Sequence, residues 1–318
     1  MKKKPLIVLT GPTAVGKTDL SIKLAKTING AIISADSMQI YKYMDIGSAK
    51  VTKEEMNGVK HYLIDDLFPD EEFNIVKFKK MALKALDEIY ANNQIPIVAG
   101  GTGFYIQALL YDIEFSDEKE SDTSYRESLE KYAKENGNEK LHEKLKSIDS
   151  ESYDKIHPNN VKRVIRAIEF YHLNGYPISE HNEKEKKKDS PYNFIYFVLN
   201  EDRDNLYDRI NKRVDIMFDK GLLEEVISLK EKGYTSDMVS MQGIGYKEIL
   251  HYLDGEYSIE YAKELIKKES RHFAKRQLTW FRREKEVIWL DKTVYTSEDM
   301  LLDEILSTLR KKGIIESV

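Results

Sequence analysis

The chain contains no cysteine, no long apolar run and no net excess of positive charge. The absence of cysteine excludes disulfide bonds and thiolate metal sites, so we expect a cytoplasmic protein. No apolar run approaches the roughly 18 residues that a membrane-spanning helix needs, so we expect no membrane anchor. The N-terminus superficially resembles a signal peptide, but its apolar stretch of about five residues leads directly into a glycine loop and indicates a buried strand.

The net charge of −5 argues mildly against nucleic-acid binding. The charge is uneven, however, because residues 263–286 contain nine Lys or Arg and four Glu, which gives this segment a charge of +5. An acidic average can therefore hide a basic face.

The 318 residues suffice for one large domain or two modest ones. Short apolar runs at residues 6–10, 31–34 and 95–99 alternate with amphipathic stretches near 16–28 and 74–91. Strands separated by helices predict a parallel sheet that is covered on both faces.

Polar helices replace this alternation between residues 116 and 190, and apolar strands return at 194–199 and 287–290. Residues 204–286 are mostly of helical character, and Ser297 is suited to cap a final helix. We predict an α/β fold: a P-loop NTPase-like parallel sheet with helices on both faces and helical C-terminal parts, formed by residues 1–115 and 193–318. We also predict an all-α insert at 116–192.

A phosphate-binding motif of the form G-x-x-x-x-G-K-[ST] follows the first predicted strand and opens a helix. It consists of Gly11, Pro12, Thr13, Ala14, Val15, Gly16, Lys17 and Thr18. Its backbone N–H groups and the helix N-terminus favour phosphate oxygens, its lysine supplies a positive charge, and the hydroxyl of Thr18 suits Mg²⁺. The motif predicts binding of a di- or triphosphate without identifying it as ATP.

A second polar segment, Asp36, Ser37, Met38 and Gln39, comes directly after the strand at 31–34. Residues beyond the carboxyl ends of parallel strands line the ligand crevice. A carboxylate there can accept a proton or hold Mg²⁺ through water, and Ser37 and Gln39 can bind a base edge. A helix N-cap would explain the same residues.

The third strand is followed by Gly100, Gly101, Thr102 and Gly103. Three glycines in four residues let the backbone approach a ligand closely, and Thr102 can donate to a phosphate. A tight turn without a ligand is the alternative.

Two pairs of arginines occur at helical spacing, Arg163 with Arg166 and Arg209 with Arg213. Each pair can clamp phosphates, although solvated surface arginines would look the same. Residues 271–283 mix cations with aromatic side chains, which suits stacking on unpaired bases. An amphipathic helix with Phe273 and Trp280 in the core is equally consistent with that pattern.

Taken together, these motifs resemble the bacterial tRNA dimethylallyltransferase (IPP transferase) family. The similarity covers nearly the whole chain, in the family's order. It rests on residues 11–18, 36–39, 100–103, 157–159 with Arg163 and Arg166, 209–217, 242–246 and 275–281.

The resemblance implies that the P-loop binds dimethylallyl diphosphate and that the adenosine at tRNA position 37 receives the dimethylallyl group. It implies Asp36 as general base, with Thr102 and Arg213 holding the diphosphate, Arg209 being the open alternative. It also implies that the helical insert at 116–192 and the C-terminal helices grip the anticodon stem-loop of the tRNA. We expect Mg²⁺ as cofactor, because it would stabilise the charge on the departing diphosphate. The expected tRNA contacts are Asp36, Ser37, Met38, Gln39, Arg163, Arg166, Gln242, Gly243, Lys275, Arg276, Gln277 and Trp280. We expect a monomer.

Two other functions share the P-loop. A small-molecule or nucleotide kinase would use Arg163 and Arg166 as lid arginines and would consume ATP. A non-catalytic RNA-binding NTPase switch would normally carry Asn-Lys-x-Asp for guanine, whereas Asn211 and Lys212 are followed by Arg213 and Val214.

Overall fold

The computed structural model describes residues 3–115 and 123–316. The chain forms two compact units, one made of Met1–Leu110 with Ser190–Val318 and the other of Tyr111–Asp189. None of the helices in the described ranges combines the length and apolar character that crossing a membrane requires.

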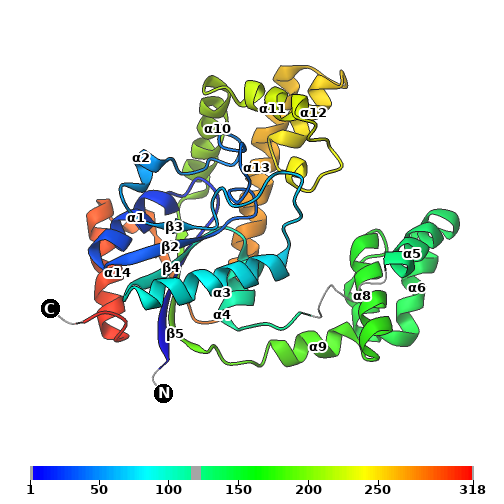
Figure 1. Cartoon of the computed structure of the whole chain (residues 1–318), viewed down its shortest axis with the longest axis horizontal. Helices are drawn as coiled ribbons and strands as arrows, with labels where there is room; N and C mark the ends of the chain where they lie inside the picture. Colours follow the sequence, from blue (N-terminus) through cyan, green and yellow to red (C-terminus); the bar gives the residue numbers. More distant parts are fainter. Residues whose placement is uncertain (1–2, 116–122, 317–318) are drawn as a thin grey trace. The chain divides into compact units, whose positions relative to one another are not determined.

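The first unit is built on a six-stranded sheet in the order β3-β2-β4-β1-β5-β6 (Figure 1). The strands are β1 (Lys4–Thr10), β2 (Gly30–Ala35), β3 (His61–Tyr62), β4 (Ile95–Gly100), β5 (Tyr192–Asn200) and β6 (Val287–Asp291). All five strand pairs are parallel. The predicted α/β fold with a parallel sheet is confirmed.

Helices cover both faces of this sheet, as its continuous apolar strands require. On one face, α1 (Lys17–Thr27) and α14 (Glu298–Lys311) share a hydrophobic core with Ile7 and Leu9 of β1. The other face carries α3 (Ile75–Ala91) and α4 (Gly103–Leu110) (Figure 1). The hydroxyl of Ser297 accepts a hydrogen bond from the N–H of Met300, so the predicted cap of the last helix is confirmed.

The C-terminal part is helical, as predicted. It comprises α10 (Arg203–Asp219), α11 (Leu222–Glu231), α12 (Tyr246–Leu253) and α13 (Ile259–Phe281), with 3₁₀ turns at Ser240–Gln242 and Lys292–Val294. Three elements were not predicted: α4, the single-turn α2 (Lys53–Met56) and the two-residue β3. The last two are too short to show a periodic pattern.

The second unit consists of five helices among its described residues: α5 (Thr123–Asn136), α6 (Asn138–Ile148), α7 (Ser150–Lys155), α8 (Val161–Asn174) and α9 (Ile178–Glu185). Its core contains Leu141, Leu145, Val164 and Ile168, so the predicted inward faces of α6 and α8 are confirmed. The buried carboxylate of Asp149 accepts hydrogen bonds from the backbone and hydroxyl groups of serines in α7 and α9, which holds these two helices together.

The strand register decides where polar residues meet. Thr10 of β1 and Ala35 of β2 both pair with Gly100 of β4, so the three strands end level with one another. The P-loop, Asp36 and the glycine turn that follow these strands therefore start at the same edge of the sheet.

Candidate active site at the carboxyl edge of the sheet

The P-loop curls around its own lysine. The ammonium of Lys17 donates hydrogen bonds to the carbonyl oxygens of Gly11 (2.9 Å) and Pro12 (2.7 Å). Gly16 adopts a left-handed conformation with φ of 96° at the N-cap position of α1, which a residue with a Cβ would adopt only with strain. The N-terminus of α1 thus faces the site with its positive end.

The P-loop borders a cleft of about 600 Å³. The residues that line it are Thr13, Ala14, Gly16, Lys17 and Thr18 of the P-loop, Asp36 and Gln39 after β2, Gly100 and Gly101 at the end of β4, Arg209, Lys212 and Arg213 of α10, and Phe273 and Gln277 of α13. The cleft continues along residues 45–52. It joins segments that are almost the full length of the chain apart.

Two cations and one carboxylate influence each other in this cleft. Burial and, to a smaller extent, the positive charge of Arg213 lower the pKa of Lys17 to about 7, although the carboxylate of Asp36 opposes both effects. Burial also lowers the pKa of Arg213, and Asp36 again acts in the opposite direction. Two desolvated cations facing one carboxylate leave a positive excess, which suits a polyanionic ligand.

The two arginines of α10 have different surroundings. The Nε of Arg209 donates to the carbonyl oxygen of Ala14 at 2.9 Å, and Arg209 also approaches Glu201. Both arginines line the cleft, but Arg213 is the more buried and lies near enough to Lys17 and Asp36 for their charges to affect one another. This difference, which the spacing of the residues could not reveal, favours Arg213 as the ligand-facing arginine.

A further cation was missed in the sequence. The ammonium of Lys292, which follows β6, donates to the carbonyl oxygen of Val15 at 3.0 Å. No motif marks it, because it reaches the P-loop only through the pairing of β6 with β5.

Asp36 does not cap a helix, so that alternative is excluded. Residues 37–40 form bends and turns, and one oxygen of Asp36 accepts the N–H of Met38 at 2.8 Å. Gln39 lines the cleft, whereas Ser37 and Met38 are half-buried outside its lining. The carboxylate of Asp36 therefore faces Lys17 and Arg213 from a fixed turn.

The glycines of the turn at the end of β4 have a packing role that the sequence did not reveal. A Cβ on any of the three would collide with the protein itself, and the expected approach of a ligand stays a prediction. The Cβ would lie 2.3 Å from the Ala35 carbonyl oxygen at Gly100, 2.1 Å from the Gln277 amide nitrogen at Gly101, and 2.2 Å from the Trp280 ring at Gly103. The absence of side chains at these glycines thus lets β2 and α13 pack closely against the turn. Thr102 lies in this turn, outside the cleft lining.

Residues of α13 divide between the interior and the surface. Gln277 is 5% exposed; its amide oxygen accepts the N–H of Thr13 and its amide nitrogen donates to the carbonyl of Gly101. Trp280 is half-buried against Gly103, and its ring meets Phe104 edge-on. Lys275 and Arg276 are exposed. Since both amide atoms of Gln277 have partners inside the fold, this side chain has a positioning role, and its contact with tRNA stays a prediction.

The remaining predicted contacts lie on other surfaces. Gln242 is exposed and donates to the backbone carbonyl of Ser236, while Gly243 packs against Met38. Arg163 of α8 is exposed and Arg166 is half-buried; both belong to the second unit.

The donors near the P-loop fit a magnesium ion that is held mainly by ligand phosphate and water. Among the described residues, no group of three or more His, Asp or Glu side chains could form a protein cage for a metal. Thr18 and Asp36 line the same cleft. One hydroxyl and one carboxylate are the kind of set that Mg²⁺ uses beside substrate phosphates.

Comparison with known proteins identifies this architecture. A sequence model described as IPP transferase matches residues 39–284. The chain belongs to the IPP transferase family. Within the family, a tRNA dimethylallyltransferase of Lachnoclostridium phytofermentans is 58% identical over 98% of this chain and 100% of its own length.

Solved structures of IPP transferases agree with this assignment. The full-length tRNA isopentenylpyrophosphate transferase of Bacillus halodurans is 43% identical, covers 98% of both chains and superposes with a TM-score of 0.74. The enzyme of Staphylococcus epidermidis is 47% identical over 98% of this chain and 100% of its own, with a TM-score of 0.72. A eukaryotic dimethylallyltransferase described as acting on tRNA has 29% identity and a TM-score of 0.84 over 99% of this chain and 81% of its own.

Proposed function

We propose that this chain transfers the dimethylallyl group of dimethylallyl diphosphate to the exocyclic N6 of adenosine at tRNA position 37, beside the anticodon, and releases diphosphate. The observation that carries the proposal is the placement of Asp36 opposite Lys17 and Arg213 in one cleft. The carboxylate can accept the proton of the attacking amine, and the two cations can stabilise the departing diphosphate. Membership of the IPP transferase family supports this over phosphoryl transfer.

The P-loop and α10 would hold the diphosphate. The backbone N–H groups of the loop, the N-terminus of α1 and the side chains of Lys17 and Arg213 supply positive charge around one volume. The bond between the allylic carbon and its oxygen breaks as negative charge grows on the diphosphate. Cations fixed in place before the reaction stabilise that charge most in the transition state. Thr102 at the neighbouring turn is the further expected diphosphate donor.

Asp36 would take a proton from the amino group of the adenine. An aromatic amine is a weak nucleophile, so a positioned carboxylate that accepts its proton as the N6–carbon bond forms assists the attack. The turn that fixes Asp36 through the N–H of Met38 keeps the carboxylate oriented without a ligand. Ser37 and Gln39 remain our proposed contacts of the adenine edge, with the amide of Gln39 oriented by Ser34 and Ala49.

A magnesium ion would be held by the hydroxyl of Thr18, with Asp36 acting directly or through water. When bound, Mg²⁺ supplies charge stabilisation for the departing diphosphate.

The tRNA would be gripped away from the chemistry. The exposed cations Lys275 and Arg276 on α13, with Arg163 and Arg166 on α8, suit phosphates of an anticodon stem-loop. Gln242 and Gly243 remain proposed contacts of the tRNA. The target base must leave its stack to enter a cleft, and a loop base costs least to extract. A monomer in the cytoplasm stays our prediction.

The test is an assay with Mg²⁺, radiolabelled dimethylallyl diphosphate and unmodified tRNA that has adenosine at position 37. We expect label to enter the tRNA, and Asp36→Asn to lower the rate by about 100-fold or more, since general base catalysis typically contributes 10²–10⁴-fold. Asp208→Asn, an exposed carboxylate on α10 outside the cleft, is the matched control. Consumption of ATP without transfer, or an undiminished rate in Asp36→Asn, would overturn the proposal.

A further inference from the structure

Residues 37–52, here called the cleft loop, connect the end of β2 to α2 with turns and no helix or strand. A loop of this length without secondary structure of its own is uncommon inside a compact domain and is usually functional. Its side chains nevertheless form much of one cleft wall, through Gln39, Ser48, Ala49 and Lys50 among others. A wall made of irregular chain keeps its shape only if other elements hold it.

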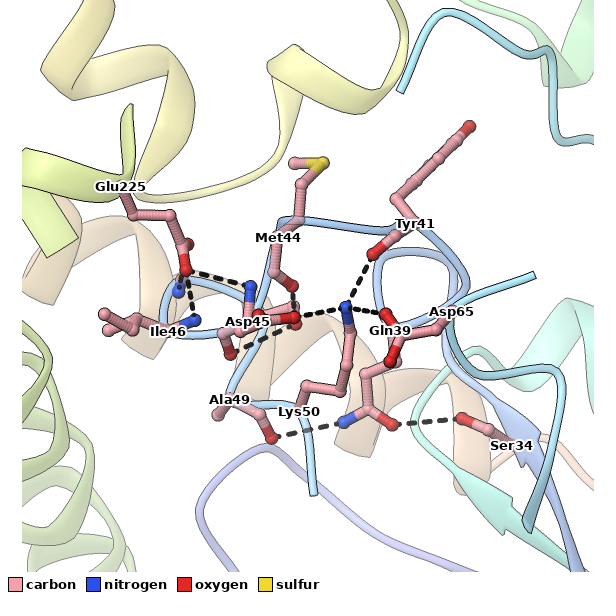
Figure 2. Close-up of polar contacts among 12 residues, drawn as sticks. Ser34, Gln39, Tyr41, Met44, Asp45, Ile46, Ala49, Lys50, Asp65 and Glu225 are labelled. Atoms are coloured by element: carbon pink, nitrogen blue, oxygen red, sulfur yellow. Dashed lines mark hydrogen bonds and ion pairs between the residues drawn. The ribbon is translucent and has the colours of Figure 1, made fainter. Parts of the chain in front are cut away.

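One side chain from outside holds the middle of the cleft loop. The carboxylate of Glu225, on α11, accepts hydrogen bonds from three consecutive backbone N–H groups: Asp45 at 2.9 Å, Ile46 at 2.7 Å and Gly47 at 3.1 Å. Figure 2 shows these bonds converging on the carboxylate. The hydroxyl of Tyr246 is a fourth donor, at 2.8 Å. With four donors on its two oxygens, Glu225 acts as an anion bound in a small backbone nest.

Tyr246 closes the same anchor from α12. Its ring is fully buried and packs on Gly47, where a Cβ would lie 2.6 Å from the ring. Next to it, the terminal carbon of Met38 would lie 2.5 Å from a Cβ at Gly243. The segment from Gln242 to Tyr246, in which we expected Gln242 and Gly243 to contact tRNA, therefore also packs against the cleft loop.

Two side chains inside the loop, Lys50 and Gln39, fix the part of it that faces the cleft. The side chain of Lys50 is 4% exposed, and its ammonium lies 2.6 Å from Asp45 Oδ1, from Asp65 Oδ1 and from the Tyr41 carbonyl oxygen (Figure 2).

Gln39 spans the gap to the sheet. Its amide oxygen accepts the hydroxyl of Ser34 in β2 at 3.1 Å, and its amide nitrogen donates to the carbonyl of Ala49 at 3.3 Å. The amide of Gln39 therefore has its orientation set by both β2 and the far side of the loop.

We propose that Glu225 is a positioning residue for the transfer reaction: by fixing the backbone of residues 45–47 it holds the cleft wall of Gln39, Ser48 and Ala49 in the shape that receives the adenine. This inference rests on the proposed function. Glu225 touches the loop and not the P-loop, so its removal changes the wall and leaves the diphosphate end intact. A displacement of about 1 Å at a reacting group can cost roughly 100-fold in rate.

The first readout is hydrogen exchange in the free protein. We expect peptides that cover residues 44–50 to exchange faster in Glu225→Ala than in wild type, with P-loop peptides unchanged. Glu224→Gln is the matched control, because Glu224 is the adjacent exposed glutamate of α11. Glu225→Gln and Tyr246→Phe are the milder variants, since each removes only part of the anchor.

The second readout is steady-state kinetics of the same proteins. We expect Glu225→Ala and Glu225→Gln to lower kcat by about 10- to 100-fold. The KM for dimethylallyl diphosphate should change by less than about threefold, because Glu225 does not touch the P-loop and its loss does not weaken binding of the diphosphate. If Glu225→Ala does not fold, Glu225→Gln and Tyr246→Phe carry both readouts.

Unchanged exchange in residues 44–50, or faster exchange with an unchanged kcat, would overturn the inference. A higher KM for dimethylallyl diphosphate together with a lower free energy of unfolding, at an unchanged kcat, would also overturn the inference, because Glu225 would then have a purely structural role. Absence of transfer by both wild type and Glu224→Gln would overturn the proposed function, and with it the catalytic part of this inference. The exchange experiment would still show whether Glu225 holds the loop.

Discussion

Gln277 on α13 and Thr13 in the P-loop, 264 positions apart in the chain, share a hydrogen bond of 2.9 Å between the amide oxygen and the backbone N–H. The amide nitrogen of the same glutamine donates to Gly101 at 3.0 Å, so one buried side chain bridges the loops after β1 and β4. The long helix α13 thus sets the spacing between two glycine-rich loops.

Gln277→Leu should therefore impair both activity and stability. Leaving a buried donor or acceptor unsatisfied costs about 1–3 kcal/mol, and here one N–H and one carbonyl lose their partner. We expect the free energy of unfolding to fall by about 2 kcal/mol in a urea titration, and kcat/KM for transfer to fall about tenfold or more. Thr279→Ala, an exposed position on the same helix, is the control. Equal stabilities of Gln277→Leu and wild type would refute the bridging role.

Lys17 should make diphosphate binding depend on pH. Its pKa in the free protein is about 7, and a bound anion raises that pKa because it favours the charged ammonium. The affinity that Lys17 contributes is therefore full below pH 7 and declines as the pH rises above 7, by at most about tenfold per unit. Calorimetry at pH 8 in two buffers of different ionisation enthalpy should detect proton uptake on binding inorganic diphosphate. Lys17→Met should abolish this uptake; persistence of the uptake would assign it to another group.

Arg213 and Arg209 should differ when each is replaced by alanine. Arg213 is desolvated in the cleft, and truncating one member of a buried charged interaction costs about 2–5 kcal/mol. We expect Arg213→Ala to weaken diphosphate binding by roughly 100-fold, about 3 kcal/mol. Arg209 binds the P-loop carbonyl of Ala14, and its loss should act mainly on the stability of the loop. Binding isotherms and melting curves of both variants separate the two effects, and a larger binding defect in Arg209→Ala would reverse the assignment.

The contact between Gly103 and Trp280 should tolerate no added methyl group. Gly103→Ala places a Cβ 2.2 Å from the indole ring, and overpacking typically costs about 1–3 kcal/mol. The double variant with Trp280→Leu should recover part of that loss, because the smaller side chain relieves the collision. A double-mutant cycle in urea measures the coupling. Strict additivity of the two changes would show that the ring does not limit this position.

The exposed cations of α13 should add to tRNA affinity through phosphates. Lys275→Ala and Arg276→Ala should each weaken binding and reduce the slope of log affinity against log salt by about 0.7–0.9, the value for one phosphate contact. Filter binding at several salt concentrations measures the slope. Lys23→Ala removes a lysine that pairs with Glu298 on α14 and should leave the slope unchanged. A slope equal to that of wild type in both α13 variants would exclude this surface.

Much of the sheet could be read from residue patterns, because buried parallel strands are continuous apolar runs and their helices are amphipathic. The missed α4 shows the limit of this reasoning. Its residues Gly103–Leu110 are buried nearly all around, so they carry no helical period. The missed anchors show another limit: Glu225, Lys50 and Lys292 look like ordinary surface charges until the fold brings backbone groups to them.

The sequence by itself determined which functional groups are present, because these motifs depend on local spacing. They are a P-loop with its lysine, a carboxylate after the second strand and arginines on a helix. The tertiary structure alone decided how they are used. The strand order places β4 between β1 and β2, so that Thr10, Gly100 and Ala35 end in register. The glycines of the turn at the end of β4 allow α13 to pack closely against it. Burial distinguished Arg213 from Arg209. Such relations depend on distances between residues far apart in the chain, which no local pattern encodes.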